Sequence, residues 1–155
     1  MQRLQSLAAR TGQAVLLYNG QPAAACYHAI SSGHTEASQN VWGGQLPYLC
    51  GVDSAWDKFA DGYEVTIQYS AEQVRTALEE LGLTPNDSPE SWVGASTWDK
   101  AGYVRTLELC GQMVSGLEVR KALDLRSTCF AIAWRGGQFV ITTRGYGHGV
   151  GLSQY

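Results

Sequence analysis

Apolar and polar residues alternate along residues 64–69 and 103–109, and this period of two favours half-buried strands. Residues 14–18 form a short apolar run followed by Asn19-Gly20, a typical hairpin turn, so residues 21–28 are the expected partner strand. Residues 129–134 and 139–143 flank Gly136-Gly137 in the same way. The pattern therefore predicts a fold built mainly from antiparallel β-hairpins.

Two helices are predicted between these strands, and each starts at a capping box. In the first, Ser70 precedes Gln73 by three residues and Gly82 is the expected stop. Its apolar residues recur with helical spacing and define one buried face: Val74, Ala77, Leu78 and Leu81. The second helix begins at Ser115 with Glu118 three residues later, and we expect it to reach residue 123.

The remaining long stretch, residues 29–60, is rich in Gly, Ser, Asn and Pro and has no clear period. Irregular segments of this length often carry function. Residues 86–94 are a second expected surface loop, and residues 110–113 are expected to turn the chain. The sequence thus predicts one α+β domain over residues 1–155, with antiparallel hairpins, two short helices and one long irregular loop.

Composition narrows the choice of partner. Only 16% of the residues are charged, and the net charge of −3 argues against a nucleic-acid-binding surface. No stretch approaches the roughly 20 apolar residues that span a membrane. Residues 1–10 contain no apolar run long enough for a signal peptide, so the sequence does not itself assign a compartment.

The final eleven residues carry the most specific signal. Glycine stands at positions 145, 147, 149 and 151, alternating with Tyr146, His148 and Val150, and Ser153-Gln154-Tyr155 follow. A backbone with so many glycines allows another segment to come very close. We expect the stretch to present polar side chains along a groove. It is not a dinucleotide fingerprint, because Val150 stands where a third glycine is required.

This ending resembles the closing G-x-G-H-G-V-G-x-S-Q-Y motif of the stage II sporulation protein D family, which includes the amidase enhancers. Other matching blocks occur in the same order as in the family. They are Tyr27-His28, residues 31–36 (S-S-G-H-T-E), residues 40–43 (N-V-W-G), the run from Pro47 to Asp57, residues 116–120 and residues 125–130. Together they cover most of the chain.

The resemblance implies that the domain acts on the glycan strands of peptidoglycan in the cell envelope. Sporulation members are lytic transglycosylases, which cleave these strands without water, and the amidase-enhancer branch assists another cell-wall hydrolase. The family's catalytic glutamate belongs to an E-M-P motif, which these 155 residues lack. The family pattern also continues into a C-terminal helix. We therefore expect an incomplete domain, and the resemblance leaves catalysis by this chain open.

Site residues follow from the matched positions. Glu36 is the remaining candidate for the catalytic carboxylate, with ordering of its own loop as the alternative role. The resemblance implies substrate contacts from the following residues: Tyr27, His28, Ser32, His148, Ser153, Gln154 and Tyr155. If the glutamate of E-M-P is required, the chain would bind or enhance rather than cut.

Cysteines and histidines gather in the first third of the chain. Cys26, His28, His34 and Cys50 would satisfy a tetrahedral structural zinc ion and would pin the long loop. A Cys26–Cys50 disulfide, with Cys110–Cys129 as a second bridge, is one alternative. Buried free thiols are the other. The sequence leaves these three possibilities open.

Overall fold

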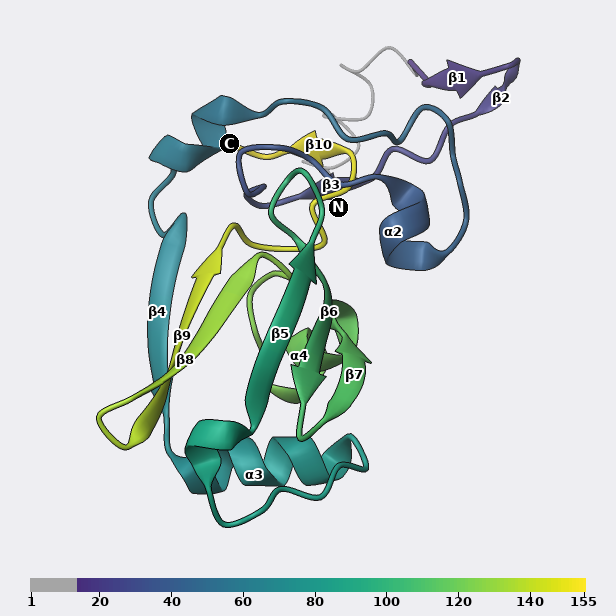
Figure 1. Cartoon of the computed structure of the whole chain (residues 1–155). Helices are drawn as coiled ribbons and strands as arrows, with labels where there is room; N and C mark the ends of the chain where they lie inside the picture. The colour runs from purple at the N-terminus through teal and green to yellow at the C-terminus, as the bar shows by residue number, and fades with distance from the viewer. Residues whose placement is uncertain (1–13) are drawn as a thin grey trace, which may run out of the picture.

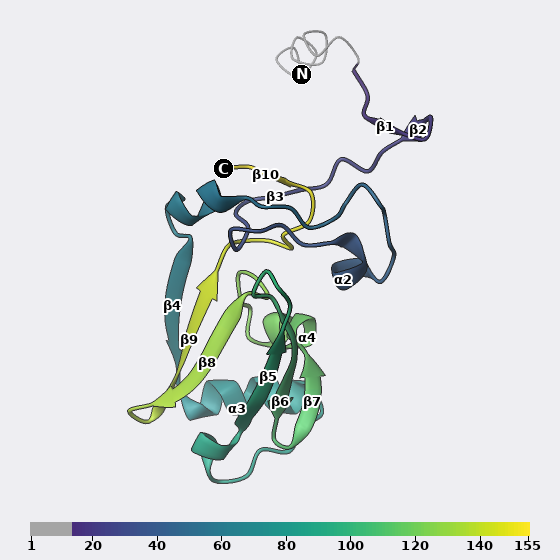
Figure 2. The same ribbon diagram turned by 45° about the horizontal axis from the view of Figure 1, so that its top comes forward.

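The computed structural model describes residues 14–155 (Figure 1). Residues 1–10, which contain no apolar run long enough for a signal peptide, lie outside the described residues. The described part has an α+β fold with mainly antiparallel sheets, which confirms the predicted class. Two three-stranded sheets and two helices form the lower body, and irregular segments form a layer over one end of the sheets (Figures 1 and 2).

One antiparallel sheet has the order β4-β9-β8 and the other has the order β5-β6-β7. Their strands are β4 Glu64–Tyr69, β9 Gln138–Arg144, β8 Phe130–Arg135, β5 Val93–Trp98, β6 Val104–Leu109 and β7 Gln112–Ser115. Ile141 in the central strand β9 lies opposite Ile67 on one side and Ile132 on the other. This register aligns apolar side chains across the sheet and directs them to the core.

Helices α3 Ala71–Glu80 and α4 Gly116–Ala122 cover the sheets. Both predicted capping boxes form, at Ser70 and at Ser115, so these side chains satisfy backbone donors that a helix start leaves free. The core between the helices and sheets includes Trp92, whose ring stacks on Phe139 with 5.6 Å between centroids. Burial of such large aromatic surfaces supplies much of the hydrophobic stabilisation.

The upper layer contains short elements joined by irregular backbone. They are β1 Leu17–Tyr18, β2 Gln21–Pro22, β3 Tyr27–His28, α2 Ser38–Trp42, the 3-10 helix η1 Ala55–Phe59 and β10 Leu152–Ser153. Strands β3 and β10 pair in parallel, although their first paired residues, Tyr27 and Leu152, lie 125 positions apart in the sequence. The layer thus joins the two ends of the described chain (Figure 2).

Several local predictions needed correction. The first hairpin forms at Asn19-Gly20, but its second strand ends at Pro22, and residues 27–28 pair with β10 instead. The 3-10 helix η2 Pro89–Ser91 and the start of strand β5 lie in the loop predicted for residues 86–94, and strand β7 begins within the turn predicted for residues 110–113. Strand β5 has irregular register around Gly94, which weakened its period-two signal. The long loop contains α2, which has no side-chain cap to mark its start.

Candidate functional site

The closing segment lies against the first matched block of the sequence. Ser153 is paired with His28 and Leu152 with Tyr27, and the Gln154 amide donates to the His28 carbonyl over 2.9 Å. Gly151 has φ of 82°, and a side chain there would collide with the backbone of Cys26. Glycine is therefore required for this close approach. The structure brings together Tyr27, His28, Ser153, Gln154 and Tyr155, and their contact with substrate stays a prediction.

Two further contacts hold the glycine-rich segment along the loop. Ile30 and Tyr146 exchange backbone hydrogen bonds of 3.0 and 2.7 Å, and the Glu36 amide donates to the Gly149 carbonyl over 2.7 Å. These bonds satisfy backbone groups that would otherwise be orphaned in an irregular region. The segment is thus fixed at three places, and its intervening side chains have defined positions.

His148 lies half-buried between an aromatic ring and a second histidine. Its ring stands edge-on to Trp42 at 5.1 Å and lies 6.1 Å from the ring of His28. Burial lowers the pKa of His148, and His28 and Arg120 lower it further. The Val150 amide donates to its Nδ1 over 3.1 Å, so the proton of the neutral ring resides on Nε2. That N–H is a donor suited to a sugar hydroxyl or carbonyl.

His28 carries an acceptor on a ring whose centroid lies 6.1 Å from that of His148. Its Nδ1 lies 3.2 Å from the Val150 carbonyl, which can only accept, so Nδ1 carries the proton and Nε2 presents a lone pair. This Nε2 is buried and has no hydrogen-bond partner within the described residues. Buried polar atoms are normally paired. The Nε2 lone pair of His28 is therefore an acceptor that a hydroxyl group or a water molecule would satisfy.

Glu36 is buried, with only 3% of its surface exposed, and both carboxylate oxygens are engaged. Oε1 accepts from the Ala37 amide at 2.7 Å and from Asn40 at 2.8 Å, and Oε2 accepts from Arg105 at 2.6 Å. Arg105 also pairs with Asp99. Burial raises the pKa of Glu36, although these hydrogen bonds partly oppose the rise. The geometry suits a group that orders the loop; its catalytic role stays a prediction.

Asp57 joins three segments of the upper layer. It comes from η1, is only 1% exposed, and accepts from the Ser31 amide over 2.6 Å and from the Ser153 hydroxyl over 2.9 Å. Burial alone would raise its pKa, but the hydrogen bonds from Ser31, Ser153 and Ser54 outweigh it and lower the pKa. Ser153 thus uses its hydroxyl within the protein, and its contact with substrate stays a prediction.

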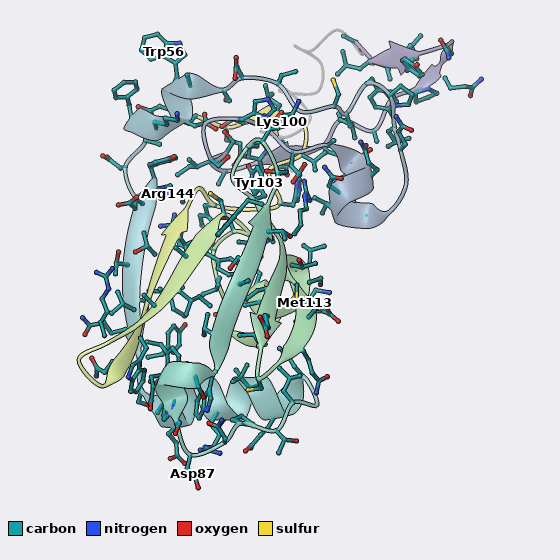
Figure 3. The ribbon with its side chains drawn as sticks, viewed as in Figure 1. Trp56, Asp87, Lys100, Tyr103, Met113 and Arg144 are labelled. Carbon is teal, nitrogen blue, oxygen red and sulfur yellow. The ribbon has the colours of Figure 1, made fainter. Side chains whose placement is uncertain are left out.

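Ser32 lies apart from the paired strands. Its hydroxyl donates to the Ala101 carbonyl over 2.9 Å, and its amide donates to the Tyr103 hydroxyl over 3.2 Å. Tyr103, labelled in Figure 3, lies just before β6 and donates to the His34 carbonyl. Burial raises the pKa of Tyr103 to about 12, so it stays a neutral donor. Ser32 connects the upper layer to the sheets and does not face the surface around Tyr27.

A groove of about 620 Å³ runs beside the paired strands. Three tyrosines line it: Tyr27, which is 62% exposed, and Tyr18 and Tyr48, whose ring centroids lie 4.8 Å apart. Leu152 and Cys26 complete the side formed by the paired strands. An aromatic-lined groove of this size can accommodate sugar rings, whose C–H faces pack on aromatic side chains.

Comparison with known proteins decides the family. The chain is 35% identical over 156 residues to stage II sporulation protein D of Bacillus subtilis (strain 168) and 34% identical to that of Bacillus amyloliquefaciens. Both matches cover the whole of this chain. The chain belongs to the stage II sporulation protein D family. It spans 44% of the length of these two relatives.

This chain is also similar to the amidase enhancer of Bacillus subtilis (strain 168), with 36% identity over 83 residues. That match covers 54% of this chain and 11% of the relative. No family model matches the chain. Relatives named for sporulation and for enhancing an amidase support a role related to the cell wall.

The four residues of the zinc hypothesis have the following surroundings in the structure. Cys26 and Cys50 line the tyrosine groove as free thiols, so the disulfide alternative is not formed. The Nδ1 atom of His34 lies 2.8 Å from the Thr35 carbonyl oxygen, and Nδ1 of His28 contacts the Val150 carbonyl oxygen. Within residues 14–155, no three His, Cys, Asp or Glu side chains are grouped to hold a metal. The four residues do not form a tetrahedral set here, and zinc stays a prediction.

Sequence reasoning overlooked several residues of this family site. Trp42 lies in the matched N-V-W-G block and Asp57 ends the matched P-Y-L run, but neither was assigned a role before the structure placed them. Arg105 gave no signal in the sequence, because no local pattern connects it to its partners Glu36 and Asp99.

No helix among the described residues is long and apolar enough to cross a membrane.

Proposed function

We propose that this domain binds the glycan strands of peptidoglycan at the surface formed by β3, β10 and the tyrosine groove. The parallel pairing of β3 with β10 is the observation that carries the proposal. It gathers exposed Tyr27, Gln154 and Tyr155 from the two ends of the described chain onto one surface. The proposal agrees with the cell-wall role that the relatives support and with an extracytoplasmic location.

The chemistry of the surface fits a neutral, hydroxyl-rich polymer. Tyr18, Tyr27 and Tyr48 offer apolar ring faces in the groove, against which the C–H faces of pyranose rings can pack. The imidazole N–H of His148 and the exposed side-chain amide of Gln154 offer hydrogen bonds to hydroxyl and N-acetyl groups. Such surfaces bind through a few stacked rings surrounded by polar contacts.

Binding without cleavage is the activity that the described residues support best. The acids nearest the paired strands, Glu36 and Asp57, are buried and their oxygens accept hydrogen bonds from the protein itself. A general acid must reach the glycosidic oxygen to protonate it. Lytic transglycosylase activity is therefore proposed to need residues other than those described. An amidase-enhancing module is the second candidate, favoured by the similarity to the amidase enhancer.

The experiment that tests the proposal is incubation of the 155-residue chain with peptide-stripped glycan strands. Cosedimentation measures binding, and mass spectrometry of the soluble fraction detects anhydro-sugar ends. We expect binding with strands of unchanged length. Anhydro products would instead make Glu36 the residue to replace, and absence of cosedimentation with a folded protein would refute glycan binding.

Variants test whether this surface makes the contacts. We expect Tyr27→Ala and His148→Ala to weaken strand binding by about tenfold, equivalent to about 1.4 kcal/mol. Met113→Ala on β7 is the matched control, because Met113 is equally exposed at 60% and lies on the lower body (Figure 3). Equal binding by all three variants would remove the assignment of the surface.

A further inference from the structure

The hairpin of β1 and β2 extends from one side of the upper layer and turns at Asn19-Gly20 (Figure 2). Each of its strands contains two residues, and together they form a separate two-stranded sheet. Asn19 and Gly20 both have positive φ, of 49° and 75°, as in the preferred two-residue hairpin turn. Two-stranded hairpins are marginally stable by themselves. The turn is therefore an exposed segment that opens at small cost.

An asparagine followed by glycine carries the groups for a reaction within the chain. The backbone nitrogen of Gly20, once its proton has passed to solvent, attacks the side-chain carbonyl carbon of Asn19. A bond from this nitrogen to Cγ forms, the bond from Cγ to Nδ2 breaks, and Nδ2 takes up a proton and leaves as ammonia. The product is a cyclic succinimide, which water opens at either carbonyl to give aspartate or isoaspartate. Glycine has no Cβ, so its nitrogen is the least hindered nucleophile for this step.

The surroundings of the turn leave this attack unhindered. Asn19 and Gly20 are exposed, and a side-chain carbon placed on Gly20 would meet no atom within 4 Å. The hairpin pairs Tyr18 with Gln21, so both turn residues lie outside the ladder of hydrogen bonds. The Gly20 amide makes no backbone hydrogen bond to the described residues. The reacting nitrogen is thus open to solvent and to the neighbouring side chain.

The two other asparagines of the sequence lack this combination. Asn40 lies in α2 and donates to Glu36 over 2.8 Å. Asn86 accepts from the Ser88 amide over 2.9 Å and from the Trp92 indole over 3.1 Å. Neither is followed by glycine. These two side chains are held by hydrogen bonds and serve as internal controls for the hairpin asparagine.

Asp61-Gly62 is a second pair that could close the same ring, by loss of water from the aspartate. Its glycine is held in place, because Arg126 donates to the Gly62 carbonyl over 2.9 Å and lies 3.3 Å from the position of an added side-chain carbon. The Tyr63 amide closes this turn by donating to the Ala60 carbonyl over 3.0 Å. Reaction at an aspartate also returns the original mass after hydrolysis, so mass distinguishes the two sites.

We infer that Asn19-Gly20 is a site of spontaneous deamidation, in which water is the reagent and ammonia is the leaving group. The net change replaces the side-chain amide by a carboxylate and needs no oxidant or reductant. Where the ring opens to isoaspartate, the main chain passes through Cβ of residue 19 and is one atom longer. A two-residue turn has no place for this atom, so the pairing of Tyr18 with Gln21 is lost.

Loss of this pairing would change one wall of the tyrosine groove. Leu16, Leu17 and Tyr18 line the groove, and the Tyr18 ring lies 4.8 Å from the Tyr48 ring between centroids. The Ala23 amide holds the base of the hairpin by donating to the Leu16 carbonyl over 2.8 Å. Deamidation is irreversible, so the groove changes with the age of the molecule. The inference concerns the hairpin itself and holds whether or not the groove binds glycan.

The test is incubation of the 155-residue chain at mildly alkaline pH in water enriched in oxygen-18, followed by peptide mapping with tandem mass spectrometry. We expect residue 19 to gain one solvent oxygen and its peptide to separate into aspartate and isoaspartate forms, while Asn40 and Asn86 stay unchanged. The rate in the folded protein should lie within about tenfold of the rate in denaturant, because the hairpin opens locally. A larger protection by folding, or equal modification at Asn40, would overturn the inference.

Two variants of the turn test the mechanism. Asn19→Gln keeps an amide but must close a larger ring, and we expect it to lose the modification. Gly20→Ala hinders the attacking nitrogen and should slow the reaction by about tenfold or more. Gly137→Ala is the matched control, because Gly137 also lies in a hairpin turn with φ of 79° and open space around it. A Gly20→Ala protein that deamidates at the parental rate would overturn the inference.

NMR spectra of the aged chain test the effect on the groove. We expect the isoaspartate form to lose the contact between the Tyr18 and Tyr48 rings, whereas Asn19→Asp, which adds the charge without the extra atom, should keep it. Persistence of the contact in the isoaspartate form would overturn the effect on the groove. The two proposals fail independently: a chain that deamidates but does not sediment with strands refutes glycan binding alone, and one that sediments but does not deamidate refutes this inference alone.

Discussion

The Ser153 hydroxyl donates to the Asp57 carboxylate over 2.9 Å, and this bond connects the closing segment to the 3-10 helix η1. The same carboxylate accepts from the Ser31 amide, so one buried side chain ties together three segments that are far apart in sequence. Hydrogen bonds to an ionised and buried group are worth more than neutral ones. Asp57 therefore acts as the junction of the upper layer.

Removing the junction should destabilise the domain. We expect Asp57→Asn to lower the free energy of unfolding by about 2 kcal/mol, because the Ser31 amide and the Ser153 hydroxyl lose their charged acceptor. Ser153→Ala should cost about 1 kcal/mol through the loss of one hydrogen bond. Denaturant unfolding measures both. Asp61→Asn is the control, since Asp61 is exposed, and equal stability of the Asp57 and Asp61 variants would refute the junction.

The pH dependence of stability should reveal the same carboxylate. Its pKa in the folded protein lies below the ordinary value of 3.8, so the folded state binds its proton less tightly than the unfolded state. The stabilisation is therefore complete above about pH 4 and is lost as the pH falls through the folded pKa. We expect thermal unfolding between pH 5 and pH 2.5 to show a smaller acid-induced loss in Asp57→Asn than in the parent protein. Parallel curves would contradict this assignment.

Replacement of Glu36 distinguishes a role in ordering the loop from a role in catalysis. We expect Glu36→Gln to lower the free energy of unfolding by about 2 kcal/mol, because the amide cannot keep the charged bond to Arg105. Glu79→Gln on the exposed side of α3 is the control. Chemical denaturation measures stability, and the strand assay is repeated below the melting temperature. If the parent protein cleaves strands, a variant with unchanged stability that no longer cleaves them would instead identify Glu36 as the general acid.

His148 should make stability fall under mildly acidic conditions. Its pKa in the folded protein is lowered from 6.5, mainly by burial, so protonation favours the unfolded state. Stability is therefore complete above the unfolded pKa and decreases as the pH falls below about 6.5. In His148→Gln this decrease should be smaller, and calorimetry between pH 7.5 and pH 5 measures the difference. The expectation fails if the two proteins lose stability equally.

The zinc hypothesis predicts a change on metal removal. If Cys26, His28, His34 and Cys50 rearrange around zinc, a chelator should lower the melting temperature of the purified chain, because bound metal stabilises the folded state. Native mass spectrometry should then find one zinc per chain. Cys50→Ser should abolish metal binding, whereas Cys110→Ser should not. Metal-free protein after purification in zinc-containing buffer would end this hypothesis.

Local sequence determined the elements whose signals lie within a few residues. The capping boxes at Ser70 and Ser115 placed two helix starts, and Asn19-Gly20 placed the first turn. The alternation along residues 64–69 predicted β4 with its observed bounds. These predictions succeeded because caps, turns and period-two patterns act through neighbouring residues. Strand β5 has a shifted register near Gly94, and its pattern was correspondingly weak.

The family motif determined which residues matter, but the tertiary structure decided what each one touches. The sequence by itself singled out residues 27–36 and 145–155 and supported the assignment to the family. It did not reveal that Ser153 would meet Asp57, that Arg105 would engage Glu36, or that Lys58 would lie over Gly33. These contacts join residues between 25 and 96 positions apart, or depend on a glycine backbone that no local pattern describes. Long-range pairing is set by burial and close packing of the whole fold, which single-residue patterns do not encode.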